Sequence, residues 1–238
     1  MQDIKNKVFL ITGGSKGIGF GIAEALLAKG CKVAITSRSQ ESADKAANQL
    51  DSSSENILGL KADVRSYEDQ KEGVDKILEK WGQLDGVIAN AGLGHFASIE
   101  DLTIAQWNEV IDTNLTGPFN SIKASLKALK QTKGYYITIS SLAGTNFFAN
   151  GAAYNASKFG LTGFTQAVML DLRSAGIKVS TIMPGSVATY FNDHQPNEAD
   201  AWKIQKEDLG KLVVDLLEMN PRTLPSKIEV RPSQPPVK

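Results

Sequence analysis

Short apolar runs alternate with longer mixed segments along nearly the whole chain. Runs of this kind are typical of strands whose two faces are both covered, because such strands meet no water on either side. They predict strands at 8–11, 33–37, 57–62, 86–89, 135–139, 178–183 and 227–230. The segments between them predict helices from Gly19 to Gly30 and over 40–50, 67–81, 104–116, 119–131, 152–175 and 207–219.

The regular alternation of strand and helix predicts an α/β fold. Right-handed crossovers then lead to one open, doubly wound parallel sheet of about seven strands with helices on both faces. A length of 238 residues suits a single domain covering 1–238. Three prolines in the last seven residues predict an exposed, non-helical tail over 231–238. In such sheets ligands bind beyond the carboxyl ends of the strands.

Composition and charge narrow the class of protein. Acidic and basic residues number 26 each, so net charge gives no reason to expect a nucleic acid or a membrane surface as partner. No apolar run approaches the roughly 20 residues that span a bilayer, and the first residues lack a signal-peptide pattern, which favours the cytoplasm. Cys31 is the only cysteine and His194 has no second histidine at ligand spacing, so no metal site is expected.

A glycine-rich turn follows the first strand and has the spacing T-G-x-x-x-G-x-G. Glycines let the backbone approach a pyrophosphate closely, and the helix that follows offers free N–H groups. The position between strand and helix favours a dinucleotide site over an ordinary loop. The residues expected there are Thr12, Gly13, Ser15, Lys16, Gly17, Ile18 and Gly19.

Tyr154 and Lys158 lie four residues apart, on one face of the predicted helix 152–175. A nearby ammonium group favours phenolate, so we expect Lys158 to lower the pKa of Tyr154 and make it a general acid or base. A surface helix pair is the alternative interpretation. Ser141 favours the catalytic one, because its hydroxyl follows a strand at the expected binding edge and can hydrogen-bond a carbonyl oxygen.

Taken together, these motifs resemble the short-chain dehydrogenase/reductase family over nearly the whole chain, in particular bacterial NADP(H)-dependent carbonyl and 3-oxoacyl reductases. The resemblance implies a Rossmann-like fold. The matching positions are Thr12, Gly13, Gly17 and Gly19; Asn90-Ala91-Gly92; Asn114; Ser141; Tyr154 and Lys158; and Pro184-Gly185 with Val187 and Thr189.

The resemblance implies hydride transfer between a nicotinamide and a carbonyl or alcohol carbon, with a small carbonyl compound as substrate. Tyr154 would protonate the oxygen, Ser141 would polarise it, and Lys158 would also hold the nicotinamide ribose. Asn114 would help to resupply protons, although Asn114 and Asn90 have plain capping as the alternative. Further cofactor contacts would come from Asp63 and Val64 at the adenine, Asn90, Ala91 and Gly92 near the central strand edge, and Pro184, Gly185, Val187 and Thr189 toward the carboxamide.

The end of the second strand bears on the choice of cofactor. An acidic residue there would bind a ribose 2′-hydroxyl, whereas this chain has Ser37 and Arg38. The planar guanidinium of Arg38 suits a phosphate, and Lys16 adds a second cation. We therefore expect NADP(H) to be preferred over NAD(H).

Two other functions stay open: an NAD(P)-dependent alcohol or sugar-alcohol dehydrogenase, and a non-catalytic nucleotide sensor. His95 is expected at the substrate mouth or in solvent, and Phe147 with Phe148 at a pocket wall. The stretch 189–207 is polar with few aromatic residues, so no large lid is expected.

Family members assemble through helices matching 104–131 and 152–175, where Ala156, Gly160 and Gly163 permit close approach. A homodimer or homotetramer is therefore expected.

Overall fold

Seven parallel strands form the centre of the molecule, in the order β3-β2-β1-β4-β5-β6-β7. The computed structural model describes residues 2–234. Every strand pair runs in parallel, as alternation of strands and helices predicts. The strands are β1 (Val8–Ile11), β2 (Lys32–Ser37), β3 (Ile57–Lys61), β4 (Gly86–Ala89), β5 (Tyr135–Ile139), β6 (Lys178–Pro184) and β7 (Lys227–Val230).

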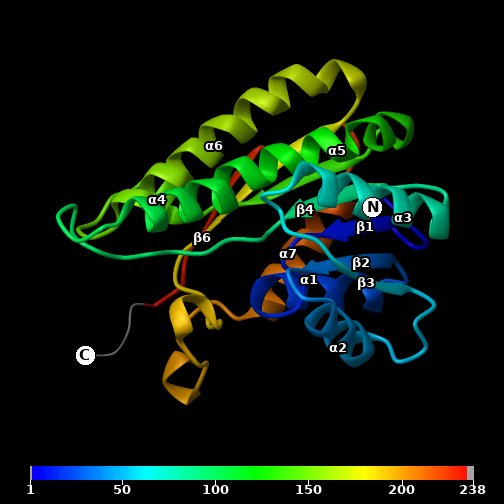
Figure 1. Ribbon diagram of the computed structural model, residues 1–238. Coiled ribbons are helices and arrows are strands. Elements are labelled where there is room, and N and C mark those ends of the chain that lie inside the picture. Colours follow the sequence, from blue (N-terminus) through cyan, green and yellow to red (C-terminus); the bar gives the residue numbers. More distant parts are fainter. Residues whose placement is uncertain (1, 235–238) are drawn as a thin grey trace.

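Helices cover both faces of the sheet (Figure 1). Alternate strand residues point to opposite faces, so Ile11 packs with one apolar cluster and Leu10 with the other. The first cluster joins the sheet to α1 (Gly17–Ala28), α2 (Gln40–Leu50) and α7 (Lys206–Glu218), and the second joins it to α3 (Tyr67–Trp81), α5 (Gly117–Thr132) and α6 (Ala152–Leu172). The predicted doubly wound sheet is confirmed.

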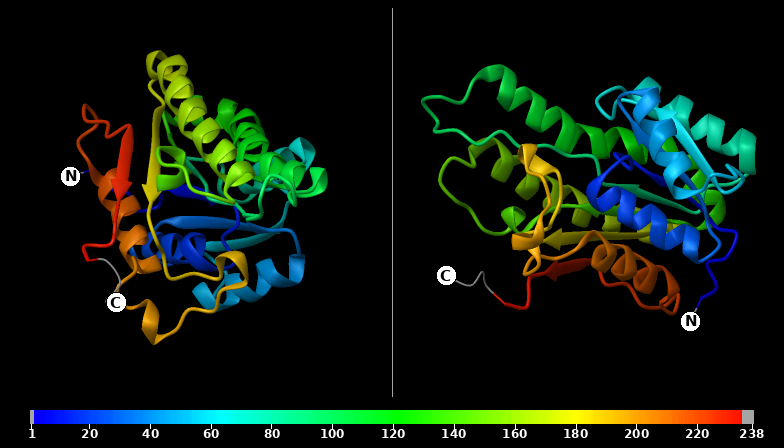
Figure 2. Two further views of the ribbon diagram at one scale, coloured as in Figure 1. Left: turned by 90° about the vertical axis from the view of Figure 1, so that its left-hand side faces the viewer. Right: turned by 90° about the horizontal axis from the view of Figure 1, so that it is seen from below.

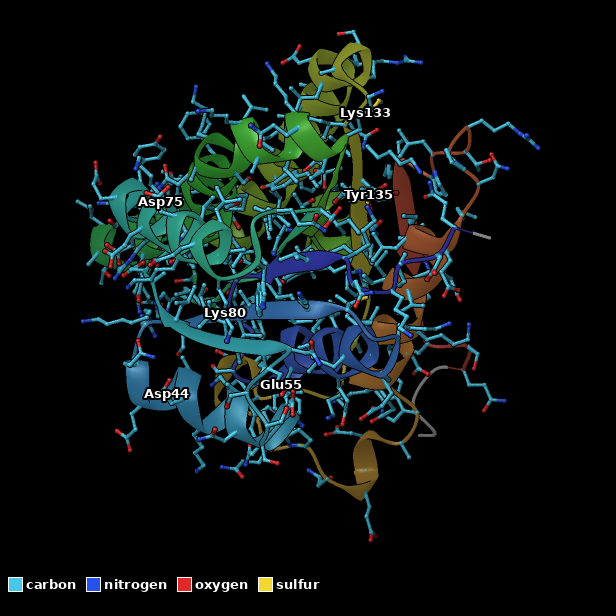
Figure 3. The ribbon with its side chains drawn as sticks, turned by 90° about the vertical axis from the view of Figure 1, so that its right-hand side faces the viewer. Asp44, Glu55, Asp75, Lys80, Lys133 and Tyr135 are labelled. Atoms are coloured by element: carbon cyan, nitrogen blue, oxygen red, sulfur yellow. The ribbon has the colours of Figure 1, made fainter. Side chains whose placement is uncertain are left out.

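The carboxyl ends of the strands lie together at one end of the molecule. Figures 1 and 2 show the loops after β4 and β5, the segment 186–205 and the end of β7 at this end. Figure 3 shows the opposite end, where Lys133 and Tyr135 mark the turn from α5 into β5. The switch in strand order between β1 and β4 places the glycine turn at the centre of the binding edge.

One helix prediction was wrong in its boundaries. We expected two separate helices over 104–116 and 119–131, but α4 (Ile104–Ile111), a π-helical turn (Asp112–Thr116) and α5 follow one another without a break. Pro118 is tolerated because it lies in the first turn of α5. The π turn carries Asn114, and turns of this type concentrate at functional sites.

The chain end differs from the prediction in one respect. Arg231, Ser233 and Gln234 are exposed and non-helical, as expected, yet residues 231–234 also line the cavity described below. The backbone N–H of Gly185 donates to the carbonyl oxygen of Val230 at 2.8 Å, which holds this segment against the end of β6. Residues 235–238 of the predicted tail lie outside the described residues.

Candidate active site

The glycine turn has a backbone that other residues adopt only with strain. Gly13 and Gly17 have φ angles of 64° and 59°. A Cβ on Gly13 would lie 2.9 Å from the Cα of Ala91, and one on Gly19 would lie 2.6 Å from the amide nitrogen of Asn90. The N-cap residue of α1, Lys16, makes no side-chain hydrogen bond to the first turn, so the N–H groups there are open and the residues present fit the pyrophosphate of a dinucleotide.

Thr12 and Asn90 tie the ends of β1 and β4 together. The Thr12 hydroxyl accepts from the backbone N–H groups of Asn90 at 3.0 Å and Ala91 at 3.1 Å. In return the Asn90 side chain donates to the carbonyl oxygens of Thr12 and Gly13, each at 3.0 Å. This reciprocal clamp fixes the glycine turn beside the loop after β4.

A cavity of about 520 Å³ lies over the ends of β1–β4 and brings most predicted cofactor residues together. Asp63 faces it with its carboxylate already held by Arg65, whose hydrogen bonds lower the pKa of Asp63. Two residues that the sequence did not assign to the cofactor, His95 and Glu109, line it as well. The predicted residues that line it are Gly13, Ser15, Lys16, Gly17, Ile18, Ser37, Arg38, Asp63, Val64, Asn90, Ala91, Gly92 and Thr189.

A second cavity of about 900 Å³ contains Ser141 and Tyr154. It shares Ile18, Thr189 and Phe191 with the first cavity, so the two form one continuous path. The predicted residues Pro184, Gly185, Val187 and Thr189 line this second part. This continuity suits a dinucleotide whose nicotinamide end would reach Tyr154.

Lys158 lies beneath this second cavity. Its side chain is buried and its ammonium group donates to the carbonyl oxygen of Ile139 at 3.0 Å. The same nitrogen lies 5.6 Å from the centre of the Tyr154 ring. Tyr154 thus has Ser141 beside it in the cavity, and the buried Lys158, which lines neither cavity, as its neighbour on α6.

The expected electrostatic effect is wrong in its direction. Burial raises the pKa of Tyr154, and only the interaction with the Ser141 hydroxyl opposes this. Burial also lowers the pKa of Lys158, to about 8. The reason is that packing around α6 buries both groups, and burial disfavours the charged form of each.

Asn114 is buried and fully engaged with protein partners. Its amide nitrogen donates to the carbonyl oxygen of Leu93 at 2.8 Å and to the Ser157 hydroxyl at 3.0 Å. Its oxygen accepts from the Leu93 backbone N–H at 2.9 Å. These bonds join the loop after β4 to α6, one residue from Lys158.

Aromatic residues that sequence reasoning left out cover Tyr154. The Phe96 and Phe191 rings lie 5.4 Å and 5.5 Å from the Tyr154 ring, centre to centre. Tyr190, Phe191 and Trp202 of the stretch 189–207, from which no large lid was expected, line the cavities. These three aromatic residues, in an otherwise polar stretch, were the feature of the sequence that pointed to 189–207 as part of the cavity wall.

The remaining candidates occupy different places. Phe148 lines the cavity, whereas Phe147 is 86% exposed. His194 binds the Asp200 carboxylate, and residues 2–234 contain no cluster of three or more metal-ligating side chains. In the same range no helix is both long and apolar enough to cross a membrane.

Comparison with known proteins agrees with this geometry. Residues 7–200 match the family model for short chain dehydrogenases. The chain is 34% identical over 192 residues to a trans-4-hydroxycyclohexanecarboxylate dehydrogenase of Sinomonas cyclohexanicum, covering 78% of this chain and 74% of that protein. It is also 34% identical over 216 residues to a 2-(S)-hydroxypropyl-CoM dehydrogenase of Xanthobacter autotrophicus, covering 87% and 84%.

Among solved structures, the fold superposes with a TM-score of 0.90 on an alcohol dehydrogenase from the archaeon Thermococcus sibiricus, complexed with 5-hydroxy-NADP. The two are 29% identical, and the match covers 98% of this chain and 99% of that one. The chain therefore belongs to the short-chain dehydrogenase family, and it is an oxidoreductase acting between alcohol and carbonyl groups.

Proposed function

We propose that this protein is an NADP(H)-dependent reductase of ketones or 3-oxoacyl compounds, with Tyr154 as the proton donor. The observation that carries the proposal is that Ser141 and Tyr154 line one end of a continuous cavity, with the buried Lys158 ammonium 5.6 Å from the Tyr154 ring. The glycine turn lies at the other part of that cavity.

In the proposed reduction, Ser141, Tyr154 and Lys158 each have a separate role. When bound, the nicotinamide supplies the hydride. Ser141 donates a hydrogen bond to the carbonyl oxygen as negative charge develops there. Tyr154 keeps its proton at neutral pH, because its pKa is raised, and gives it to the same oxygen. The Lys158 ammonium, 5.6 Å from the ring, stabilises the phenolate that remains.

Asn114 keeps the role of a positioning residue in this scheme. It holds the loop after β4 against α6 and thereby fixes the surroundings of Lys158. Proton resupply past Asn114 is part of the same proposal.

The preference for NADP(H) rests on Arg38 and Lys16, which line the adenosine part of the cavity at the end of β2. A guanidinium and an ammonium group both suit a 2′-phosphate. The complex of the Thermococcus sibiricus enzyme with 5-hydroxy-NADP supports this part of the proposal. In Arg38→Ala we expect the Kd of NADPH to rise about tenfold and that of NADH to stay within twofold.

An alcohol or sugar-alcohol dehydrogenase working in the oxidative direction is the second candidate, supported by the two dehydrogenases among the relatives. A non-catalytic nucleotide sensor is the third candidate, and the proposed proton donor Tyr154 in the cavity argues against it.

We also propose a cytoplasmic enzyme that forms at least a dimer through α5 and α6, where Phe119, Phe159 and Leu170 are exposed.

The test is NADPH oxidation, followed by absorbance, with a panel of ketones and 3-oxoacyl thioesters. Tyr154→Phe is expected to reduce kcat by about 10²- to 10⁴-fold, because the proton donor is lost. Tyr67→Phe, on the outer side of α3 and 39% exposed, is the matched control. Unchanged turnover in Tyr154→Phe contradicts the mechanism, and NADPH binding without turnover of any substrate in the wild type indicates the sensor.

A further inference from the structure

A carboxylate from α4 lies beside Arg38, at a point where the sequence indicated only cations. The end of β2 itself has no acidic residue, which favours NADP(H). Glu109, 71 positions after Arg38, nevertheless lines the same cavity as Lys16, Ser37 and Arg38. Its Oε1 lies 3.8 Å from Nη1 of Arg38.

Glu109 is held in this position from two sides. Its other carboxylate oxygen is 2.8 Å from Nε2 of His95, in the loop after β4. That loop is itself fixed by Asn114 through both backbone groups of Leu93. The His95 hydrogen bond lowers the pKa of Glu109, so the side chain carries its negative charge at neutral pH.

Side chains of both signs of charge lie near Arg38 and Glu109. Lys16 and Arg38 attract a phosphate there, while Arg65 is largely neutralised by its ion pair with Asp63. The Arg38 side chain is 68% exposed and free to turn, whereas that of Glu109 is 34% exposed. A 2′-phosphate near Arg38 would therefore face the charge of Glu109 and compete with it for the guanidinium. A 2′-hydroxyl meets no such repulsion and can donate to a carboxylate.

We infer that Glu109 is a specificity-determining residue that weakens the discrimination between NADP(H) and NAD(H). The carboxylate that commonly follows β2 in NAD-binding sheets is here supplied from α4, across the cavity from the cations. The inference rests on the proposed binding of the cofactor's adenosine end at Arg38.

The test is binding rather than turnover. Titration of the protein with NADPH and with NADH, followed by isothermal calorimetry, gives the ratio of the two Kd values. In Glu109→Gln the Kd of NADPH is expected to fall about three- to tenfold at low salt, while that of NADH stays the same or rises. The shift in the ratio should shrink at high ionic strength, because charge carries it.

Glu79→Gln on α3 is the matched control, since it removes one exposed carboxylate that lines neither cavity. Glu109→Ala also removes the charge and is expected to shift the ratio in the same direction. The inference is overturned if both Glu109 variants, folded as judged by their thermal unfolding, change the ratio no more than Glu79→Gln does. If the wild type binds NADH more tightly than NADPH, the proposed cofactor preference is contradicted. The change in the Kd ratio between wild type and Glu109 variants still tests the role of Glu109.

Discussion

The ammonium nitrogen of Lys158 lies 5.6 Å from the centre of the Tyr154 ring, and it is anchored to the backbone of β5 and not to the phenol. Both side chains belong to α6, yet the hydrogen bond to Ile139 of β5 fixes the position of the Lys158 ammonium group. The Lys158 ammonium is therefore held by the sheet rather than by the phenol, and burial lowers its pKa.

The lowered pKa of Lys158 predicts how the free energy of unfolding depends on pH. The unfolded chain keeps the Lys158 proton up to the ordinary pKa of 10.5, whereas the folded protein releases it near pH 8. The unfolded state thus binds more protons between these values, so the free energy of unfolding should rise with pH, by up to about 3 kcal/mol for this group. Urea denaturation from pH 7 to 10, compared between the wild type and Lys158→Met, isolates the effect from other titrating groups. Parallel curves for the two proteins would show that Lys158 is not the cause.

Asn114 should matter for both folding and turnover. Asn114→Ala leaves the partly buried backbone groups of Leu93 without their partner, which is expected to cost about 1–3 kcal/mol of unfolding free energy. Because the loop beside Lys158 loosens, kcat should fall more than tenfold while KM changes little. Asn108→Ala, exposed on α4, is the control for helix propensity. An Asn114 variant with normal kcat would limit the residue to a structural role.

Arg231 lines the cavity that holds Ser141 and Tyr154, and among the described lining residues there is no Asp or Glu. His194 and Lys203 line it as well, but both are paired with the Asp200 carboxylate. The exposed pair of Arg231 with Glu229 leaves most guanidinium donors available. A ketone with a carboxylate should therefore show a KM about three- to tenfold lower than its methyl ester.

In Arg231→Ala this difference between acid and ester should largely vanish, with kcat for the ester unchanged. Arg222→Ala, in an exposed turn away from the cavity, should keep the difference. Equal KM values for acid and ester in the wild type would count against a charged substrate.

Asp85 is expected to stabilise the far end of the sheet. Its carboxylate accepts from the Val8 backbone N–H at 2.9 Å and from the Lys7 ammonium at 2.8 Å, and the residue is 7% exposed. Asp85→Ala should cost about 2–3 kcal/mol, because a buried N–H loses its partner. Asp75→Ala on α3 (Figure 3) breaks only an exposed pair with Lys71 and should cost less than about 0.5 kcal/mol. Similar losses for the two variants, measured by urea denaturation, would contradict this assignment.

The strands were predictable because their pattern is local. A strand covered on both faces must be apolar throughout, so Val8–Ile11 and Tyr135–Ile139 are visible as such in the sequence. The joined helices α4 and α5 were not, since Gly117 and Pro118 interrupt the pattern without ending the helix. The π turn between them carries Asn114, whose buried side chain bonds across to Leu93 and Ser157, distant in the sequence.

The sequence by itself determined the parallel sheet, the glycine turn and the identity of Ser141, Tyr154 and Lys158, because each depends on spacing within one element or on strand ends that share an edge. Tertiary structure alone decided which residues from other elements reach that edge: Phe191 over Tyr154, residues 231–234 at the substrate end, and Glu109 beside Arg38. It also decided the direction of the Tyr154 pKa. Contacts between distant segments and the loss of water around a buried group arise only when the chain packs, and no local pattern records them.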